Sequence, residues 1–368
     1  KYSLKNTIRN IIFIIVSFTV GFTILYYIFS NYNEAYLAEC AIKGIAKEEC
    51  DFLQKIKVDF WSVNPLWVIT ALLAFTLSNV SRAMRWNLTL APLGYQPKLY
   101  NSIIAVFITY FVNLFIPRMG EVARAAALNH AEKIPVEKAM GTIVLGRIMD
   151  VIMLLFFIAI AFLLEYDTLW TWLNENMEID KKGGGLFSNL IFLVALSLGI
   201  LGFAVFIVFR KKIMETTIYK KIVALVLGFW EGIVSVRKLA SPGQFIFHTV
   251  FIWIMYFVMN YLFFFSFEPT SDLSPVVALM VFVFGAFGIV IPSPGGMGTY
   301  HWLVIAALGI YGVNQYDAFS FANIAFFSIQ IFCNIAFGLI SIALLFLLNR
   351  NYVPKYSGLE EDKNSNHA

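Results

Sequence analysis

The chain has 368 residues, of which 60% are hydrophobic and 14% charged, and its mean hydropathy is +0.75. This composition excludes an ordinary soluble domain, and the continuous apolar runs lack the alternation of a transmembrane β-barrel. The net charge of +4 fits an uneven distribution of basic residues across a membrane and does not indicate nucleic-acid binding. We therefore expect an all-α polytopic membrane protein with about six full spans and two opposed re-entrant helical hairpins, forming one transmembrane domain over residues 1–349.

The first predicted span is an apolar run from Ile11 to Phe29, which follows a basic N-terminal segment. It differs from a signal peptide because it is too long and because Ser30-Asn31-Tyr32 offers no small-residue cleavage site. The span is therefore expected to remain uncleaved and to begin in the cytoplasm. Residues 31–64 then form an outer loop. In it Cys40 and Cys50 either form a disulfide on an oxidising side or remain two thiols.

Two pairs of short apolar segments interrupt the longer spans. The first pair covers residues 101–132 and is broken at Pro117, and the second covers 276–312 and is broken at Pro292. An arm of about 16 residues reaches roughly 24 Å as a helix, which is shorter than a ~30 Å hydrocarbon core. This favours two re-entrant hairpins, although replacing each hairpin by two short spans leaves the rest of the topology unchanged. Opposed broken segments in the two halves of a chain are typical of an inverted-repeat transporter.

The remaining chain completes the predicted topology. Lys and Arg predominate on the loops assigned to the inner side and acidic residues on the outer side, so both termini are expected in the cytoplasm. Residues 213–239, basic at both ends, predict a helix lying on the cytoplasmic face, and residues 350–368 predict a disordered cytoplasmic tail. The other long apolar segments predict spans at residues 65–81, 137–164, 186–209, 244–265 and 318–348.

Five ionisable residues fall at membrane depth in this topology. Arg118, Glu121 and Arg124 follow one helical face at the start of the second arm of the first hairpin, and Arg147 and Asp150 lie one turn apart within a span. A helix N-terminus that carries arginines is suited to phosphate. We therefore predict a lipid head-group site. The alternative is a pair of structural ion pairs, Arg118 with Glu121 and Arg147 with Asp150.

The tip of the second hairpin is uncharged but rich in glycine. Its backbone N–H groups could form an anion nest, while the alternative is a tight turn between packed helices. Aromatic residues just after the turn either line the site or belong to an aromatic belt. The candidate head-group residues from this hairpin are Ser293, Gly295, Gly296, Gly298, Tyr300 and His301. Arg82, Arg85 and Trp86 are assigned to the membrane interface as secondary residues.

Catalytic motifs are missing from the sequence. It contains no HExxH motif, no Cys/His metal cluster and no aspartate pair at helical spacing. Ser293 and His301 would make a Ser-His dyad, but no usual nucleophile motif surrounds the serine. We therefore expect a protein that is not an enzyme and that needs no metal or cofactor.

Four motifs, in order, carry a resemblance to a known family. They are Arg82-x-x-Arg85-Trp86, Pro117-Arg118-x-Gly120-Glu121-x-x-Arg124, Arg147-x-x-Asp150 and Pro292-x-Pro294-Gly295-Gly296-x-Gly298. Together they resemble the membrane region of lysylphosphatidylglycerol synthetase/flippase proteins over about residues 11–348. The resemblance implies a bacterial or archaeal inner-membrane protein that moves or presents lipids with modified head groups.

Two departures from the family pattern shape the expected function. Synthetase members carry a soluble aminoacyl-transferase domain after the membrane part, whereas a short tail follows here, so this chain is not expected to make aminoacyl lipid. Many relatives carry a glutamate after the glycine turn, where this chain has Thr299-Tyr300-His301-Trp302. We expect a flippase that binds a lipid head group between the hairpin tips. The ligand would be an anionic or aminoacyl phospholipid or a polyprenyl-phosphate glycolipid. The alternative is a non-transporting scaffold that docks a separate lipid-modifying enzyme.

Overall fold

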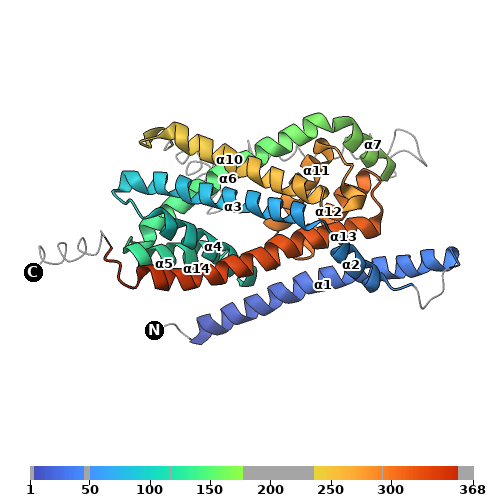
Figure 1. Cartoon of the computed structure of the whole chain (residues 1–368), viewed down its shortest axis with the longest axis horizontal. Helices are drawn as coiled ribbons and strands as arrows, with labels where there is room; N and C mark the ends of the chain where they lie inside the picture. The colour runs from blue at the N-terminus through green and yellow to red at the C-terminus, as the bar shows by residue number, and fades with distance from the viewer. Residues whose placement is uncertain (1–3, 45–49, 117, 177–235, 292, 355–368) are drawn as a thin grey trace, which may run out of the picture. The chain divides into compact units, whose positions relative to one another are not determined.

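The structure is a computed structural model that describes residues 4–44, 50–116, 118–176, 236–291 and 293–354 (Figure 1). Within these ranges the chain is helical and has no strand. In the described part of the chain, four helical segments are long and apolar enough to cross a membrane: Pro65–Leu93, Val136–Leu164, Pro242–Phe264 and Gln315–Asn349. The expected all-α polytopic class is confirmed. The predicted span 186–209, residues 213–235 of the predicted interfacial helix and the tail beyond residue 354 lie outside the described ranges.

The chain divides into two units, residues 1–161 with 239–368, and residues 162–238. The second unit holds the last residues of α6 (Val136–Leu164), helix α7 (Tyr166–Asn176) and the 3₁₀ turn Val236–Lys238. Within it Tyr166 and Trp170 stack one helical turn apart, with ring centroids 6.2 Å apart. A cluster of charged residues belongs entirely to the first unit: Arg82, Arg85, Glu121, Arg124, Arg147 and Asp150.

Helix α1 (Leu4–Ile42) contains the predicted first span but continues well past Phe29. Residues 30–42 include no glycine or proline, so nothing in this polar segment breaks the helix. Part of the expected outer loop is therefore helical. A disulfide joins Cys40 to Cys50, whose Cα atoms are 6.3 Å apart, and leads into α2 (Phe52–Ser62).

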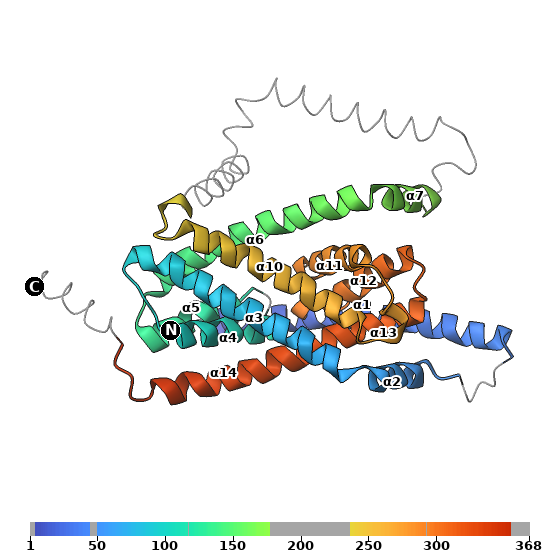
Figure 2. The same cartoon turned by 45° about the horizontal axis from the view of Figure 1, so that its top comes forward.

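Helix α3 (Pro65–Leu90) is also longer than the predicted span, which ended at Ser81. Asn64 caps its N-terminus and Pro65 occupies the first turn, an arrangement that favours helix initiation. No glycine or proline follows before Leu90. The helix therefore extends beyond the apolar run, and α10 (Pro242–Phe264) runs alongside it in both views (Figures 1 and 2).

The first pair of short helices, α4 (Leu99–Phe115) and α5 (Gly120–Glu132), packs closely. The backbone N–H of Gly120 donates to Asn113 Oδ1 at 2.7 Å. A Cβ at Gly120 would lie 2.6 Å from the Asn113 side chain, so only glycine fits where α5 begins.

The second pair, α11 (Pro275–Val290) and α12 (Thr299–Ile310), is packed in the same way. A Cβ on Gly288 would lie 2.6 Å from Tyr300 Cα, which requires glycine at this crossing. The turn between them includes the 3₁₀ segment Pro294–Gly296, and Gly295, Gly296 and Gly298 have φ values of 58°, 84° and 81°. This turn contacts the end of α4, where a Cβ on Gly295 would lie 3.4 Å from Leu114. The two hairpin tips are therefore neighbours.

The C-terminal helical segment combines α13 (Gln315–Phe326), a π-helical stretch (Phe327–Cys333) and α14 (Asn334–Asn349). Helix α14 packs along α4. A Cβ on Gly338 would overlap the Phe111 side chain, so glycine permits this close approach.

Among the residues that the structure describes, apolar packing is divided between two clusters. The larger one joins α2, α10 and α13 through fully buried rings such as Phe52, Phe264 and Phe321. The smaller one contains Trp86 and Leu128 and gathers residues of α3, α4, α5 and α6. The charged cluster lies beside this second apolar cluster, since Trp86 belongs to the apolar cluster and also lines the cavity that the charged residues surround.

Candidate functional site

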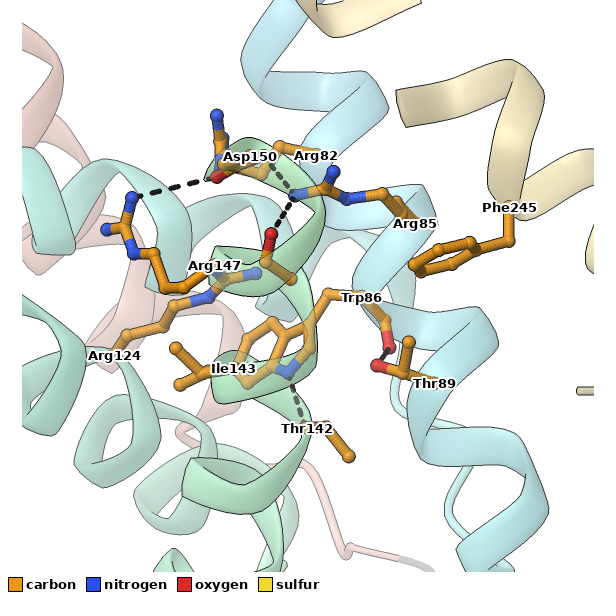
Figure 3. A pocket seen from close by; sticks show the side chains of 11 residues that line it. Arg82, Arg85, Trp86, Thr89, Arg124, Thr142, Ile143, Arg147, Asp150 and Phe245 are labelled. Carbon is orange, nitrogen blue, oxygen red and sulfur yellow. Dashed lines mark hydrogen bonds and ion pairs between the residues drawn. The ribbon is translucent and has the colours of Figure 1, made fainter. Parts of the chain in front are cut away.

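A small cavity lies among α3, α5, α6 and α10 (Figure 3). Its volume is about 20 Å³, which is room for about one water molecule. The lining side chains include four arginines and one aspartate, an unusual concentration of charge for a membrane-spanning bundle. The lining residues are Arg82, Arg85, Trp86, Thr89, Arg124, Thr142, Ile143, Gly146, Arg147, Asp150 and Phe245.

Asp150 of α6 holds two arginines of α3. Its Oδ2 accepts from Arg82 Nη1 at 2.6 Å and its Oδ1 accepts from Arg85 Nη2 at 2.9 Å. The three side chains are 12%, 8% and 4% exposed, respectively. Charge-assisted hydrogen bonds to both carboxylate oxygens tie α6 to α3. Arg82 and Arg85 therefore serve mainly to hold α3 against α6 through Asp150.

A set of hydroxyl groups extends this network to two further helices. Arg82 Nη2 donates to the Tyr256 hydroxyl at 3.2 Å, and that hydroxyl lies 2.7 Å from the hydroxyl of Tyr110. Arg85 Nη1 donates to Thr249 Oγ1 at 3.3 Å. Because Tyr110 is on α4 while Thr249 and Tyr256 are on α10, the two arginines connect the first hairpin to α3 and α10.

Arg147 is the exposed member of the cluster. It forms an ion pair with Glu121 of α5, and its Nη1 lies 3.7 Å from Asp150 Oδ2. Its side chain is 48% exposed, far more than those of the two α3 arginines. A long, exposed side chain bound to one close partner can change position at little cost in packing.

Arg124 is buried with an incomplete set of partners. Its guanidinium lies 3.8 Å from the centroid of the Trp86 ring, a cation–π contact, and the residue is 6% exposed. Trp86 is itself fixed by a 2.9 Å hydrogen bond from Nε1 to Thr142 Oγ1. Among the described residues, neither Nε nor Nη2 of Arg124 has a hydrogen-bond partner. Buried donors of this kind are normally satisfied, so these two are available to an anion in the cavity.

The structure brings together four of the five residues predicted from the first half of the chain: Glu121, Arg124, Arg147 and Asp150. Arg118 is exposed with φ of 68°, and within the described ranges it has no ion pair. Of the two anticipated structural pairs, Arg147 with Asp150 is present at 3.7 Å. In place of Arg118, Glu121 contacts Arg147, and the closest partners of Asp150 are the α3 arginines.

The candidate residues of the second hairpin do not line this cavity. Ser293 Oγ lies 3.1 Å from Thr299 Oγ1, which donates to the Gly288 carbonyl at 2.6 Å. His301 Nδ1 accepts from the Gly298 N–H at 3.3 Å, and the imidazole is fully buried against Phe326. These bonds fix the shape of the tip, and they do not join Ser293 to His301.

Arg82, Arg85 and Trp86, assigned from the sequence to the membrane interface as secondary residues, line the cavity. All three are buried because α3 continues past Ser81 and carries them into the bundle. A signal was present in the sequence, since polar residues recur every three or four positions along α3 at Ser78, Ser81, Arg82, Arg85 and Thr89. The hydroxyl partners Tyr110, Thr142, Thr249 and Tyr256 had no comparable signal.

Comparison with known proteins gives a consistent result. The family model for the lysylphosphatidylglycerol synthase TM region matches residues 52–351. A UPF0104 membrane protein of Methanocaldococcus jannaschii is 34% identical over 108 residues, which are 28% of this chain and 32% of the relative. The match thus spans about a third of that relative's length. No solved structure matches the chain. The chain belongs to the lysylphosphatidylglycerol synthase TM-region family of multi-pass helical membrane proteins.

Proposed function

We propose that this protein translocates a lipid with a phosphate-bearing head group across the membrane and binds that head group at the arginine cavity. The observation that carries the proposal is Arg124, a buried guanidinium with two donors that lack partners among the described residues. Arginine matches the geometry of phosphate, and an intramembrane charge without a full set of partners is expected at a substrate site. Membership of a family named for a lipid synthase supports a lipid substrate.

The cavity must open to admit a head group. At about 20 Å³ it holds roughly one water, so a lining side chain has to move before phosphate can reach Arg124. Arg147 is best placed to do so, since it is exposed and is held mainly by Glu121. In the proposed cycle Arg147 leaves Glu121, engages the phosphate and returns when the lipid departs. Throughout this cycle Asp150 keeps its hydrogen bonds to Arg82 and Arg85.

The second hairpin would form the other wall of the pathway. Its glycine turn contacts the end of α4, so movement of one tip affects the other. We infer that both hairpins re-enter the membrane from opposite sides as parts of an inverted repeat, and that their tips separate to let the head group pass. Acyl chains would stay in the bilayer during this movement.

The proposed location is the cytoplasmic membrane with both termini inside. This orientation is supported by the basic N-terminal segment and by the Cys40–Cys50 disulfide, which belongs on an oxidising side. The head-group cavity would then collect lipid from one leaflet and release it to the other.

Reconstitution in liposomes tests the proposal. Liposomes would carry a head-group-labelled phospholipid whose outer-leaflet fluorescence is removed by an impermeant reductant. We expect the protein to expose the inner-leaflet pool as well, and Arg124→Ala to slow that phase by at least about tenfold. Arg350→Ala, which alters an exposed arginine at the end of α14, is the matched control and should behave like the parent chain.

Two results would count against translocation. Full activity of a folded Arg124→Ala variant would remove the cavity from the mechanism. Failure of the folded parent protein to move any labelled lipid would instead favour a scaffold that docks a lipid-modifying enzyme. Thermal unfolding of each preparation before reconstitution separates both results from misfolding.

A further inference from the structure

The charges of the cluster do not balance. Arg82, Arg85, Arg124 and Arg147 carry four positive charges, because arginine stays protonated in proteins. Asp150 and Glu121 supply two negative charges, and the cluster is left with a net charge of +2. Each carboxylate is already bound to arginine. The excess positive charge therefore has no partner among the described residues of the cavity.

Several buried side-chain atoms of the same cluster also lack a hydrogen-bond partner among the described residues. Arg124 offers Nε and Nη2, and Arg82 offers a buried Nε without a partner among the described residues. One turn before Arg124 on α5, Glu121 Oε2 is also buried and unpaired within the described structure. The cluster thus presents several donors and one acceptor. That set suits a group with several anionic oxygens and a neighbouring hydroxyl.

We propose that the preferred head group carries two negative charges on phosphate, as in a lipid phosphomonoester or a glycosylated lipid diphosphate, which has one charge on each phosphate. This inference rests on the proposed function and narrows its substrate class. A phosphomonoester carries about −1.5 to −2 charges at neutral pH and has three acceptor oxygens. A phosphomonoester therefore neutralises the net charge of +2, whereas a phosphodiester carries one negative charge and leaves the cluster with a net charge of +1. A lysyl head group adds positive charge next to buried arginines and is excluded by repulsion.

Lipid binding to the purified full chain tests this charge preference directly. The chain would be placed in phosphatidylcholine nanodiscs and titrated with lipids that share the same acyl chains. The probes are phosphatidic acid as the phosphomonoester, phosphatidylglycerol as the monoanionic diester, and lysylphosphatidylglycerol as the cationic lipid. A glycosylated lipid diphosphate, with one charge on each phosphate, provides the second dianionic source. We expect phosphatidic acid or the diphosphate to bind at least about tenfold more tightly than phosphatidylglycerol, and lysylphosphatidylglycerol to bind most weakly.

Two substitutions separate charge from shape. Arg124→Gln keeps amide donors but lowers the net charge to +1, and it should reduce the preference for phosphatidic acid over phosphatidylglycerol at least about fivefold. Glu121→Gln raises the net charge to +3 and keeps an acceptor oxygen, so the preference for the dianionic lipid should persist. Arg350→Ala should leave all affinities unchanged.

Equal or tighter binding of phosphatidylglycerol or lysylphosphatidylglycerol by the folded parent chain would overturn the inference. That comparison stands even if Arg124→Gln fails to fold, because it uses the unaltered protein. The outcome is also separable from the proposed function. Translocation that depends on Arg124 but ignores head-group charge would leave the function intact and remove this substrate class. Selective binding of the dianionic lipid without translocation would support this substrate class and contradict the proposed function.

Discussion

The guanidinium of Arg124 lies 3.8 Å from the centre of the Trp86 ring while two of its nitrogen donors have no partner among the described residues. The ring packs on the face of the guanidinium and leaves the two buried donors at its edge unpaired. An edge of this kind presents N–H groups in the plane that a phosphate oxygen approaches. The Arg124 side chain therefore packs against Trp86 and still has unpaired donors for a phosphate oxygen.

Arg124→Met is expected to stabilise the protein while abolishing phosphate-lipid binding. Methionine fills similar space without placing a charge beside three other guanidiniums, and no hydrogen bond from Nε or Nη2 is lost. The free energy of unfolding should rise by about 1 kcal/mol or more, as at other sites where function opposes stability. Thermal unfolding in detergent and nanodisc binding provide the two measurements. A less stable variant would mean that Arg124 has a structural role instead.

Asp150→Ala is expected to have the opposite effect on stability. It removes the carboxylate that accepts from both Arg82 and Arg85, leaving two buried guanidiniums uncompensated. Loss of one partner from a buried ion pair costs about 3–5 kcal/mol. Denaturant or thermal unfolding should detect this change, with Asp272→Ala at an exposed loop position as the control. Similar stability of the two variants would contradict the assignment of Asp150 as the residue that holds Arg82 and Arg85.

Gly288→Ala is expected to disrupt the second hairpin. The added Cβ would lie 2.6 Å from Tyr300 Cα, so α11 and α12 would have to separate at about 1–3 kcal/mol. Gly309→Ala is the matched control in the same hairpin, since no atom lies within 4 Å of its Cβ position. The control should be neutral or slightly stabilising. Equal unfolding temperatures for the two variants would show that the arms are not packed as described.

The Cys40–Cys50 disulfide should be accessible from outside the cell if the proposed orientation is correct. Intact cells treated with an impermeant reductant and then an impermeant maleimide should incorporate label, and the Cys40→Ser/Cys50→Ser variant should not. The buried Cys333 remains unlabelled in both and serves as the internal reference. Loss of this crosslink should lower stability by about 2–3 kcal/mol for a loop of this length. Labelling that requires membrane permeabilisation would reverse the proposed topology.

Local sequence properties were enough for the class of the fold and the positions of the short helices. Prolines and glycines near residues 117 and 292 ended apolar runs where the structure also ends α4 and α11. Helices α1 and α3 continue past Phe29 and Ser81, where their apolar runs end, since hydropathy marks the apolar part of a helix and not its end. A helix ends where its backbone is interrupted or uncapped, and neither polar stretch contains a breaker.

The sequence by itself determined that this is a helical membrane protein with charged residues among its apolar segments, because composition and local spacing decide both. It named Glu121, Arg124, Arg147 and Asp150, since ionisable residues in apolar surroundings are conspicuous. Only the tertiary structure decided their partners. Asp150 meets Arg82 and Arg85 from a helix more than sixty positions earlier, and Arg124 is left with free donors against Trp86. Such pairings depend on how α3, α5 and α6 pack, and no local pattern encodes that geometry.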